Sequence, residues 1–338
     1  MQNTKQKPST KQKLTIAAIF GAMGPGLLAA LSGNDAGGIA TYSSAGASYG
    51  YKMLWMLPVM TVLLIVTQET AARCGCVTGK GLASLIRERF GVRKSVLAMA
   101  ALLIANTAVT ISEFAGIASG LALFGVPASI SVPLVALLVW MLTMSGSFQR
   151  IDTVSGSLAA DIIAGFIIIT TGTVLFPAGI QISDAADAAR ALEPIAGQWS
   201  TVLFASGLVA ASFLAACVLP GVTSSAICEA FGWERGADRS WDEAPVYRGI
   251  ITAIIGISAV LVLMPGVDLF QIMMTSQVIN GVLLPVVLVF QVVIAADRHI
   301  MGANRNGRVW NVLTWATIAV ITVLTVVMFV LQAMGYSA

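Results

Sequence analysis

Charged residues are scarce in this sequence. Only 10% of its 338 residues are Asp, Glu, Lys or Arg, whereas soluble domains carry about 25%. Hydrophobic residues make up 57% of the chain, and its mean hydropathy is +0.87. A soluble core could not bury this much apolar surface, so lipid must surround most of the chain. In lipid, only helices or closed barrels satisfy every backbone polar group.

Metal-binding and catalytic motifs are also missing. The chain has one histidine and four cysteines, and neither Cys74-Gly-Cys76 nor the pair Cys217 and Cys228 forms a zinc or disulfide pattern. His299 stands in a predicted cytoplasmic loop and is not expected to bind metal. Sequences typical of zinc proteases, P-loop ATPases, dinucleotide enzymes and serine hydrolases do not occur. We therefore predict neither an enzyme nor a resident cofactor, and any transport must run on a gradient.

Long uninterrupted apolar runs, such as Val96–Ile104 and Thr317–Leu331, are present instead. They exclude the alternating pattern of a membrane barrel and predict an all-α, polytopic membrane protein. At about 20 residues per crossing, we predict nine transmembrane helices, of which the first is broken. The predicted spans are residues 15–48, 53–77, 95–124, 129–147, 153–177, 200–230, 246–265, 270–296 and 309–335. They form a single transmembrane domain, residues 1–338, that begins with a basic cytoplasmic tail at residues 1–14.

The basic residues support this count. Every Lys and Arg except Lys52 and Arg190 falls in the tail, in loops or near span ends that the nine spans place on one side of the bilayer. The positive-inside rule then predicts a cytoplasmic N-terminus and an outside C-terminus in the cell membrane. The net charge of +3 is accounted for by this orientation, so nucleic acid is not an expected partner.

The first span holds the strongest candidate site. Residues Ser32–Gly38 place Asn34, Asp35, Gly37 and Gly38 at mid-membrane depth, where glycines weaken a helix by about 1 kcal/mol each. An unwound segment frees backbone carbonyls for a cation, and a carboxylate at that depth needs an ion or a partner. We predict that Asp35 and these neighbours bind a metal ion; a glycine cluster for helix packing, with a neutral Asp35, is the alternative.

Further polar residues lie inside other predicted spans. Glu113 is either part of a proton or ion pathway or a protonated side chain bonded between helices. Asp161, two turns into its span from the cytoplasmic side, is a candidate for an inner vestibule. Gln277 and Asn280 share one helix face, and their amide oxygens suit a hard cation or interhelical hydrogen bonds. Glu69 precedes Arg73 by four residues, which favours an ion pair.

Several motifs together resemble the NRAMP family of divalent-metal transporters, and in the C-terminal half its NRAMP-related magnesium-transporter branch. They are Gly24-Pro-Gly-Leu-Leu, Asn34-Asp-Ala-Gly-Gly-Ile-Ala-Thr-Tyr42, Gln68-Glu-Thr-Ala-Ala-Arg73, Val77-Thr-Gly-Lys-Gly-Leu-Ala83, Glu229-Ala-Phe-Gly-Trp-Glu-Arg235 and Asp297-Arg-His-Ile-Met-Gly302. The resemblance implies a LeuT-type inverted-repeat fold and a secondary transporter for divalent metal cations that binds the ion at the unwound first helix.

Departures from the family pattern refine this expectation. Ala36 replaces a proline and Gly38 a ligating asparagine, which leaves room for a partly hydrated Mg²⁺. Thr110 stands where the family has a second acid beside Glu113. The resemblance places no thioether or thiolate at the site, so Mg²⁺ is favoured and Mn²⁺ is next. An amino-acid carrier is disfavoured because Asp35 would repel a substrate carboxylate.

The resemblance also implies a gap. The family's fifth and sixth helices have no counterpart between Gln149 and Arg150, so we expect an incomplete inverted repeat and a second chain as a possible source of the missing helices. The alternative function is that of a non-transporting shortened paralogue or membrane partner protein.

Overall fold

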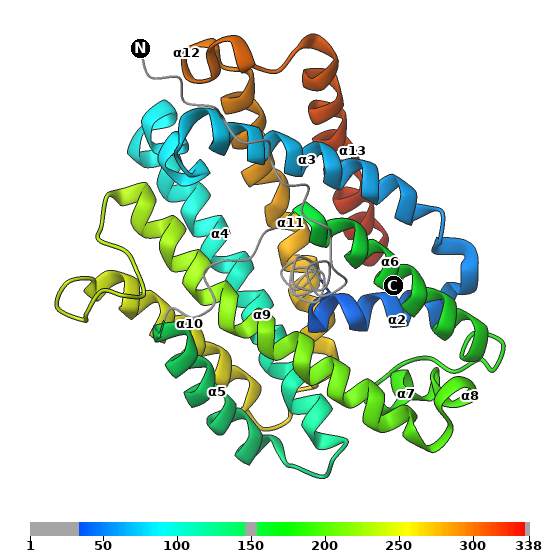
Figure 1. The fold of residues 1–338 in the computed structure, drawn as a ribbon. Coiled ribbons are helices and arrows are strands. Elements are labelled where there is room, and N and C mark those ends of the chain that lie inside the picture. The colour runs from blue at the N-terminus through cyan, green and yellow to red at the C-terminus, as the bar shows by residue number, and fades with distance from the viewer. Residues whose placement is uncertain (1–33, 146–153, 335–338) are drawn as a thin grey trace, which may run out of the picture.

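A computed structural model describes residues 34–145 and 154–334, and in this part of the chain helices joined by loops occur without strands (Figure 1). The predicted all-α class is confirmed. Residues 1–33, and with them the basic tail and the first half of the predicted first span, lie outside the described residues. The elements are α2 (Ala36–Tyr49), η1 (Gly50–Met53), α3 (Met56–Thr78), α4 (Leu82–Ala122), α5 (Ala128–Met144), α6 (Val154–Val174), α7 (Ala185–Arg190), α8 (Glu193–Ala196), η2 (Gly197–Trp199), α9 (Ser200–Phe231), α10 (Pro245–Val262), α11 (Leu269–Ala296), α12 (Arg298–Met301), η3 (Gly302–Asn304) and α13 (Arg308–Ala333).

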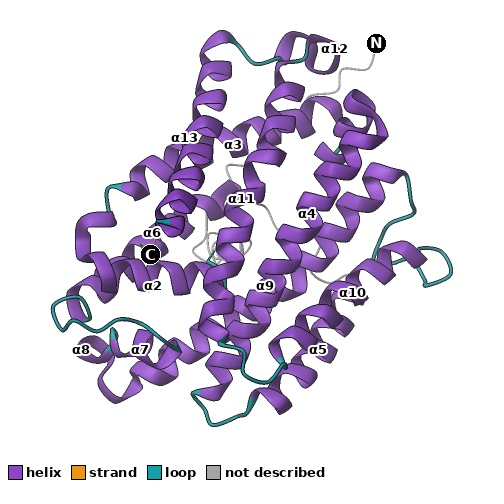
Figure 2. Ribbon diagram, turned by 180° about the vertical axis from the view of Figure 1, so that it is seen from behind, coloured by secondary structure: helices purple, strands orange, loops and turns teal. Residues whose placement is uncertain are grey.

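Three long helices, α4, α9 and α11, form the centre of the molecule. Helices α4 and α9 run side by side, with α5 and α10 on one flank (Figure 1), and α11 packs against α4 (Figure 2). Small residues make this close packing possible, as is usual between membrane helices. A Cβ at Gly116 of α4 would lie 2.4 Å from the Ala36 Cβ and 2.5 Å from the Ser212 Oγ. These helices therefore bring α2 and α9 to the same stretch of α4.

Helix α4 extends further than predicted. It begins at Leu82 rather than near residue 95, and the two parts meet at Gly91, whose φ of 74° breaks the helical geometry. The first part is rich in charge, so a search for apolar runs passes over it. Glycine reaches this φ without the steric cost that a side chain would add. The helix therefore changes direction at Gly91.

Helices α2 and α6 lie in contact at glycines. A Cβ at Gly46 would lie 1.9 Å from the Thr171 Oγ1, and one at Gly172 would lie 3.2 Å from the Gly50 Cα. Beyond η1 the chain turns sharply, since α2 with η1 and α3 are bent by 108°. The described half of the first predicted span therefore packs along α6 before the chain turns into α3.

Each predicted span after the first coincides with one helix, but not all of these helices are long enough to cross a bilayer alone. Five helices of the described chain qualify by length and composition, or six if the bent pair of α2–η1 and α3 counts as one span. Helix α5 and the apolar part of α6 are shorter. Exposed Val312, Val323 and Val326 on α13 fit a lipid-facing surface. The count of nine crossings and the orientation remain predictions.

Candidate functional site

Asp35 starts α2. Its backbone is extended (φ −68°, ψ 170°), and its Oδ1 accepts a 2.6 Å hydrogen bond from the Gly38 N–H. A side chain that caps the first turn in this way satisfies a backbone donor that the helix leaves unpaired. The other carboxylate oxygen, Oδ2, accepts a 2.8 Å hydrogen bond from Nε2 of Gln277. The structure therefore joins two of the predicted site residues.

Two glycines explain how the amide reaches Asp35. A Cβ at Gly37 would lie 2.3 Å from Nε2 of Gln277, and one at Gly38 would lie 2.8 Å from Oδ1 of Asp35. Side chains at these positions would displace the amide or the carboxylate. Gly37 and Gly38 thus leave open the space that the Gln277 amide and the Asp35 carboxylate occupy.

A second carboxylate approaches the same turn. Glu113 of α4 is fully buried, and its Oε2 accepts a 3.2 Å hydrogen bond from the Ala36 N–H. Its Oε1 has no hydrogen-bond partner among the described residues. The partial positive charge of a helix N-terminus favours anions there. None of the ion pairs in the described ranges involves Asp35 or Glu113, so two carboxylates share this end of α2 without a cationic side chain.

The other residues predicted for the site differ in how close they lie to Asp35. Asn34, directly before Asp35, is buried, and Asn280 is half-buried one turn along α11 from Gln277. Asp161 of α6 faces α3 instead, and its Oδ2 accepts a 2.9 Å hydrogen bond from Thr61 of that helix. This hydrogen bond ties Asp161 to α3, and no hydrogen bond joins Asp161 to Asp35 among the described residues.

A thioether beside the site was not predicted. The Thr41 Oγ1 donates to the Gly37 carbonyl at 2.8 Å and lies 3.7 Å from the sulfur of Met274. Met274 precedes Gln277 by three residues, so the two side chains share the face of α11 that meets α2. That spacing could have suggested Met274 from the sequence. The expectation that no thioether stands near the site therefore needs correction, although the contact of this sulfur is with Thr41.

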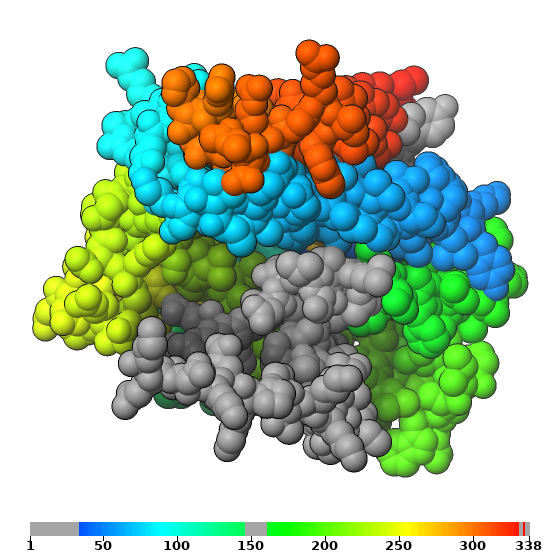
Figure 3. Space-filling model, turned by 45° about the horizontal axis from the view of Figure 1, so that its top comes forward, coloured from blue at the N-terminus to red at the C-terminus, as the bar shows by residue number. Residues whose placement is uncertain are grey.

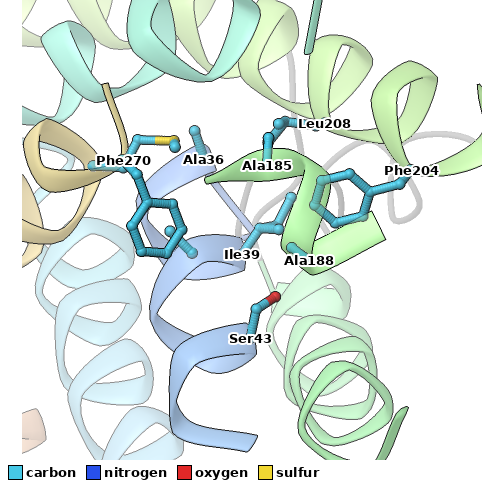
Figure 4. Close-up of a pocket in the computed structure, with 10 residues that line it drawn as sticks. Ala36, Ile39, Ser43, Ala185, Ala188, Phe204, Leu208 and Phe270 are labelled. Atoms are coloured by element: carbon cyan, nitrogen blue, oxygen red, sulfur yellow. The ribbon is translucent and has the colours of Figure 1, made fainter. Parts of the chain in front are cut away.

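A small apolar cavity lies beside α2 (Figure 4). Its walls come from α2, α7, α9 and α11 and include Ile39, Phe204, Leu208 and Phe270. Ser43 is the one polar side chain among the lining residues. A dehydrated cation needs several oxygen ligands, so this cavity is unsuited to the ion, and the polar end of α2 remains the candidate site.

Two further sequence predictions concern the Glu69–Arg73 pair and the cysteines, which lie away from Asp35 in the sequence. The Glu69–Arg73 ion pair is confirmed at 2.9 Å, and Arg73 also binds the Asn304 carbonyl and the Asn306 side chain. All four cysteines are free, and Cys217 is buried with its carbonyl accepting from Thr143. No group of three or more His, Cys, Asp and Glu side chains that could hold a metal occurs in the part of the chain that the structure describes.

Comparison with known proteins identifies the family. The family model described as natural resistance-associated macrophage protein-like matches residues 26–151 and 147–331. The chain belongs to the Nramp family. Similar curated Nramp relatives include the divalent metal cation transporters MntH of Erwinia tasmaniensis (34% identical over 161 residues) and Yersinia pestis (31% over 178 residues). These alignments cover 44% and 49% of this chain but only 37% and 40% of the relatives, so the chain spans well under two thirds of their length.

Solved Nramp structures share the fold. A manganese transporter of Eremococcus coleocola, solved with an aromatic bis-isothiourea substituted compound, superimposes with a TM-score of 0.64 at 17% identity. The match covers 96% of this chain and 88% of the other. A mutant of the same transporter gives a TM-score of 0.63 at 16% identity, covering 99% and 91%. The predicted LeuT-type transporter fold is confirmed, whereas identities this low carry no information on the ion.

Proposed function

We propose that this chain is a secondary transporter that binds a hard divalent cation at the start of α2, with Mg²⁺ preferred and Mn²⁺ next. One observation carries the proposal. The Asp35 carboxylate, at the break of the first span, is held by the Gln277 amide of α11, and a second carboxylate, Glu113, sits on the adjoining backbone. Two carboxyl groups at one helix end, with no cationic partner among the described residues, would favour the entry of a cation.

The ligands of the site would be oxygens. Rotation of the Gln277 amide presents its oxygen in place of its nitrogen, and either Asp35 oxygen has a lone pair left for a metal. Asn34 and Asn280 would add amide oxygens. Because Gly37 and Gly38 bring no side chains, the ion would keep part of its water shell, as Mg²⁺ does in most proteins. Mn²⁺ accepts the same ligands.

Glu113 and Asp161 would serve as stations for a proton or the ion. Glu113 is buried and accepts a hydrogen bond from the first turn of α2. Asp161 is half-buried and accepts a hydrogen bond from Thr61 of α3. Carboxylates placed along one route in a membrane are typical of ion and proton pathways.

The relatives named divalent metal cation transporters support the type of substrate. The two stretches matched by the family model meet at residues 147–151, the place where we propose that two family helices are lacking. A second chain would then supply them. In the alternative, the shortened chain binds the ion without carrying it and acts as a paralogue or partner protein in the membrane.

Uptake into proteoliposomes tests the proposal. Mg²⁺, Mn²⁺ and Ca²⁺ are compared for the unsubstituted protein, for Asp35→Ala, and for Asp268→Ala, which removes an exposed helix-capping acid at the start of α11. We expect Asp35→Ala to abolish divalent uptake and Asp268→Ala to retain it. Uptake by Asp35→Ala within about twofold of the unsubstituted protein would refute the assignment. Cation binding without uptake in the unsubstituted protein would favour the alternative.

Calorimetric titration with Mg²⁺, Mn²⁺ and Cd²⁺ tests the choice of metal. We expect Mg²⁺ and Mn²⁺ to bind with similar affinity and Cd²⁺ to show no large advantage, because the proposed ligands are oxygens. The variants Cys217→Ala and Met274→Leu serve as controls for sulfur. Tight Cd²⁺ binding that either variant abolishes would identify a sulfur ligand and overturn the hard-cation reading.

A further inference from the structure

The break in α4 exposes a short basic stretch. Gly91, Val92, Arg93 and Lys94 are all exposed, directly before the long apolar part of the helix. None of the ion pairs of the described chain involves Arg93 or Lys94. Lys94 lies over the Phe90 ring at 5.4 Å, which orients its ammonium group. Two cations thus stand at the end of a membrane helix without an acidic partner.

The same helix face continues as an apolar stripe. Arg93, Leu97, Ala100 and Ile104 are exposed, and their spacing of four, three and four residues places them on one side of a helix. Leu97 is 60% exposed and Ile104 is 55% exposed. From residue 93 to residue 104 a helix rises about 16 Å, close to half of the roughly 30 Å hydrocarbon core. The stripe therefore fits one leaflet of a bilayer, with its charge at the headgroup level.

The surroundings keep this end of the helix positive. Nearby Glu88 is paired with Lys80, and Asp297, which caps the start of α12, is paired with Arg89. Arg298, next to Asp297, is exposed. The start of α4 and the α12 region lie next to each other on the molecular surface (Figure 3).

We propose that this face of α4 binds one anionic phospholipid. The phosphate would lie at Arg93 and Lys94, and an acyl chain would follow Leu97 and Ile104. Arg93 and Lys94 have no acidic partner in the described chain and would bind an anion. The apolar stripe, about as long as one leaflet is thick, would bind an acyl chain, and an anionic phospholipid carries both groups. Clusters of Lys and Arg at the end of a membrane helix attract anionic lipids at about 1 kcal/mol for each charge. This site does not depend on metal transport.

Lipid titration of the purified full chain tests the proposal. Delipidated protein in detergent receives phosphatidylglycerol or phosphatidylcholine, and native mass spectrometry counts the bound lipids. We expect one phosphatidylglycerol to bind in preference to phosphatidylcholine. The double variant Arg93→Gln/Lys94→Gln should weaken that binding about tenfold or more. The matched control Arg305→Gln/Arg308→Gln removes two exposed cations before and at the start of α13 and should leave the affinity within about twofold.

Two further measurements test whether the bound molecule is a lipid rather than a free phosphate. Leu97→Ser/Ile104→Ser should also weaken phosphatidylglycerol binding, because it removes the surface for the acyl chain. Inorganic phosphate should not displace the lipid. The proposal would be overturned by any of three results. These are an equal loss of phosphatidylglycerol affinity in the Arg305→Gln/Arg308→Gln control, equal binding of phosphatidylcholine, and displacement of the lipid by phosphate. Because all substituted side chains are exposed, unfolding curves recorded without lipid should coincide for every variant.

Discussion

The side-chain amide of Gln277 donates a 2.8 Å hydrogen bond to the carboxylate of Asp35, although the two residues are 242 positions apart in the chain. This bond ties α11 to the first turn of α2. Each partner is predicted from the sequence as a site residue, and the structure adds that the two are hydrogen-bonded to each other. With the Gln277 amide rotated, the pair would offer the proposed ion oxygens from two parts of the chain.

The first prediction concerns this pair. Replacing Gln277 by Ala should weaken divalent-cation binding about tenfold, because a hydrogen bond to a charged group contributes roughly 1.5 kcal/mol or more and the proposed amide ligand is lost. Gln271→Ala, an exposed glutamine on the same helix, is the matched control. Calorimetric titration of both variants gives the answer. Equal affinities for the two variants would remove Gln277 from the site.

The second prediction concerns helix contact at Gly116. An added Cβ there would meet Ala36 and Ser212, so Gly116→Ala should destabilise the protein by about 1–3 kcal/mol and push the first turn of α2 away from Glu113. Gly207→Ala in α9 has nothing within 4 Å and should stabilise slightly, since alanine favours a helix over glycine. Thermal unfolding in detergent compares the two. A stabilising Gly116→Ala would contradict the close contact.

The third prediction concerns pH and Asp297. The backbone N–H of His299 and the Arg89 guanidinium lower the pKa of this carboxyl below its ordinary value of 3.8. A lowered pKa means that the charged form stabilises the fold above the unfolded pKa and that this contribution is lost as the pH falls through the folded pKa. Asp297→Asn should therefore unfold at a lower temperature than the unsubstituted protein at neutral pH.

That difference in unfolding temperature should narrow below about pH 4. Asp242→Asn, an exposed acid without an ion pair among the described residues, should have little effect at any pH. If the difference in unfolding temperature between Asp297→Asn and the unsubstituted protein stays constant down to about pH 3, the charge of Asp297 does not contribute to stability.

The fourth prediction concerns orientation. Cysteines introduced at Ser183 and Ser240, both exposed, should react with an impermeant reagent from opposite sides of the membrane, with Ser240 on the cytoplasmic side. Cys76 is the one exposed native cysteine in the described chain, so a Cys76→Ser background is required. Labelling of both positions from one side would show that the count of crossings is wrong.

Apolar patterning predicts much of the fold, because a helix in lipid must be apolar over about 20 residues. For that reason the predicted spans 200–230, 246–265 and 270–296 differ from α9, α10 and α11 by only a few residues. The start of α4 at Leu82 was missed, since its first turns lie outside such a run. The Glu69–Arg73 pair was predicted because local spacing sets it.

The sequence indicates which residues are candidates for the site, but not which of them contact one another. The carboxylates and amides stand out because polar groups are rare in apolar spans. No local rule connects Asp35 with Gln277, or Asp161 with Thr61, because helix packing alone brings these pairs together. Met274 was not predicted because methionine is ordinary in a membrane helix, and its spacing from Gln277 gains meaning only once Gln277 is placed against α2.

The glycine contacts between α2 and α6 have a mechanical consequence. Helices that approach this closely at Gly172, and at Gly46 with the Thr171 hydroxyl against it, leave little freedom to slide, so we expect the two helices to move as one rigid body. The links from α2 to α4 and α11, by contrast, include single side-chain hydrogen bonds from Ala36 and to Asp35, which can break and re-form. Any opening of the site should therefore run along the seam with α4 and α11. A cross-link between α2 and α6 should leave ion uptake intact, whereas one between α2 and α11 should block it.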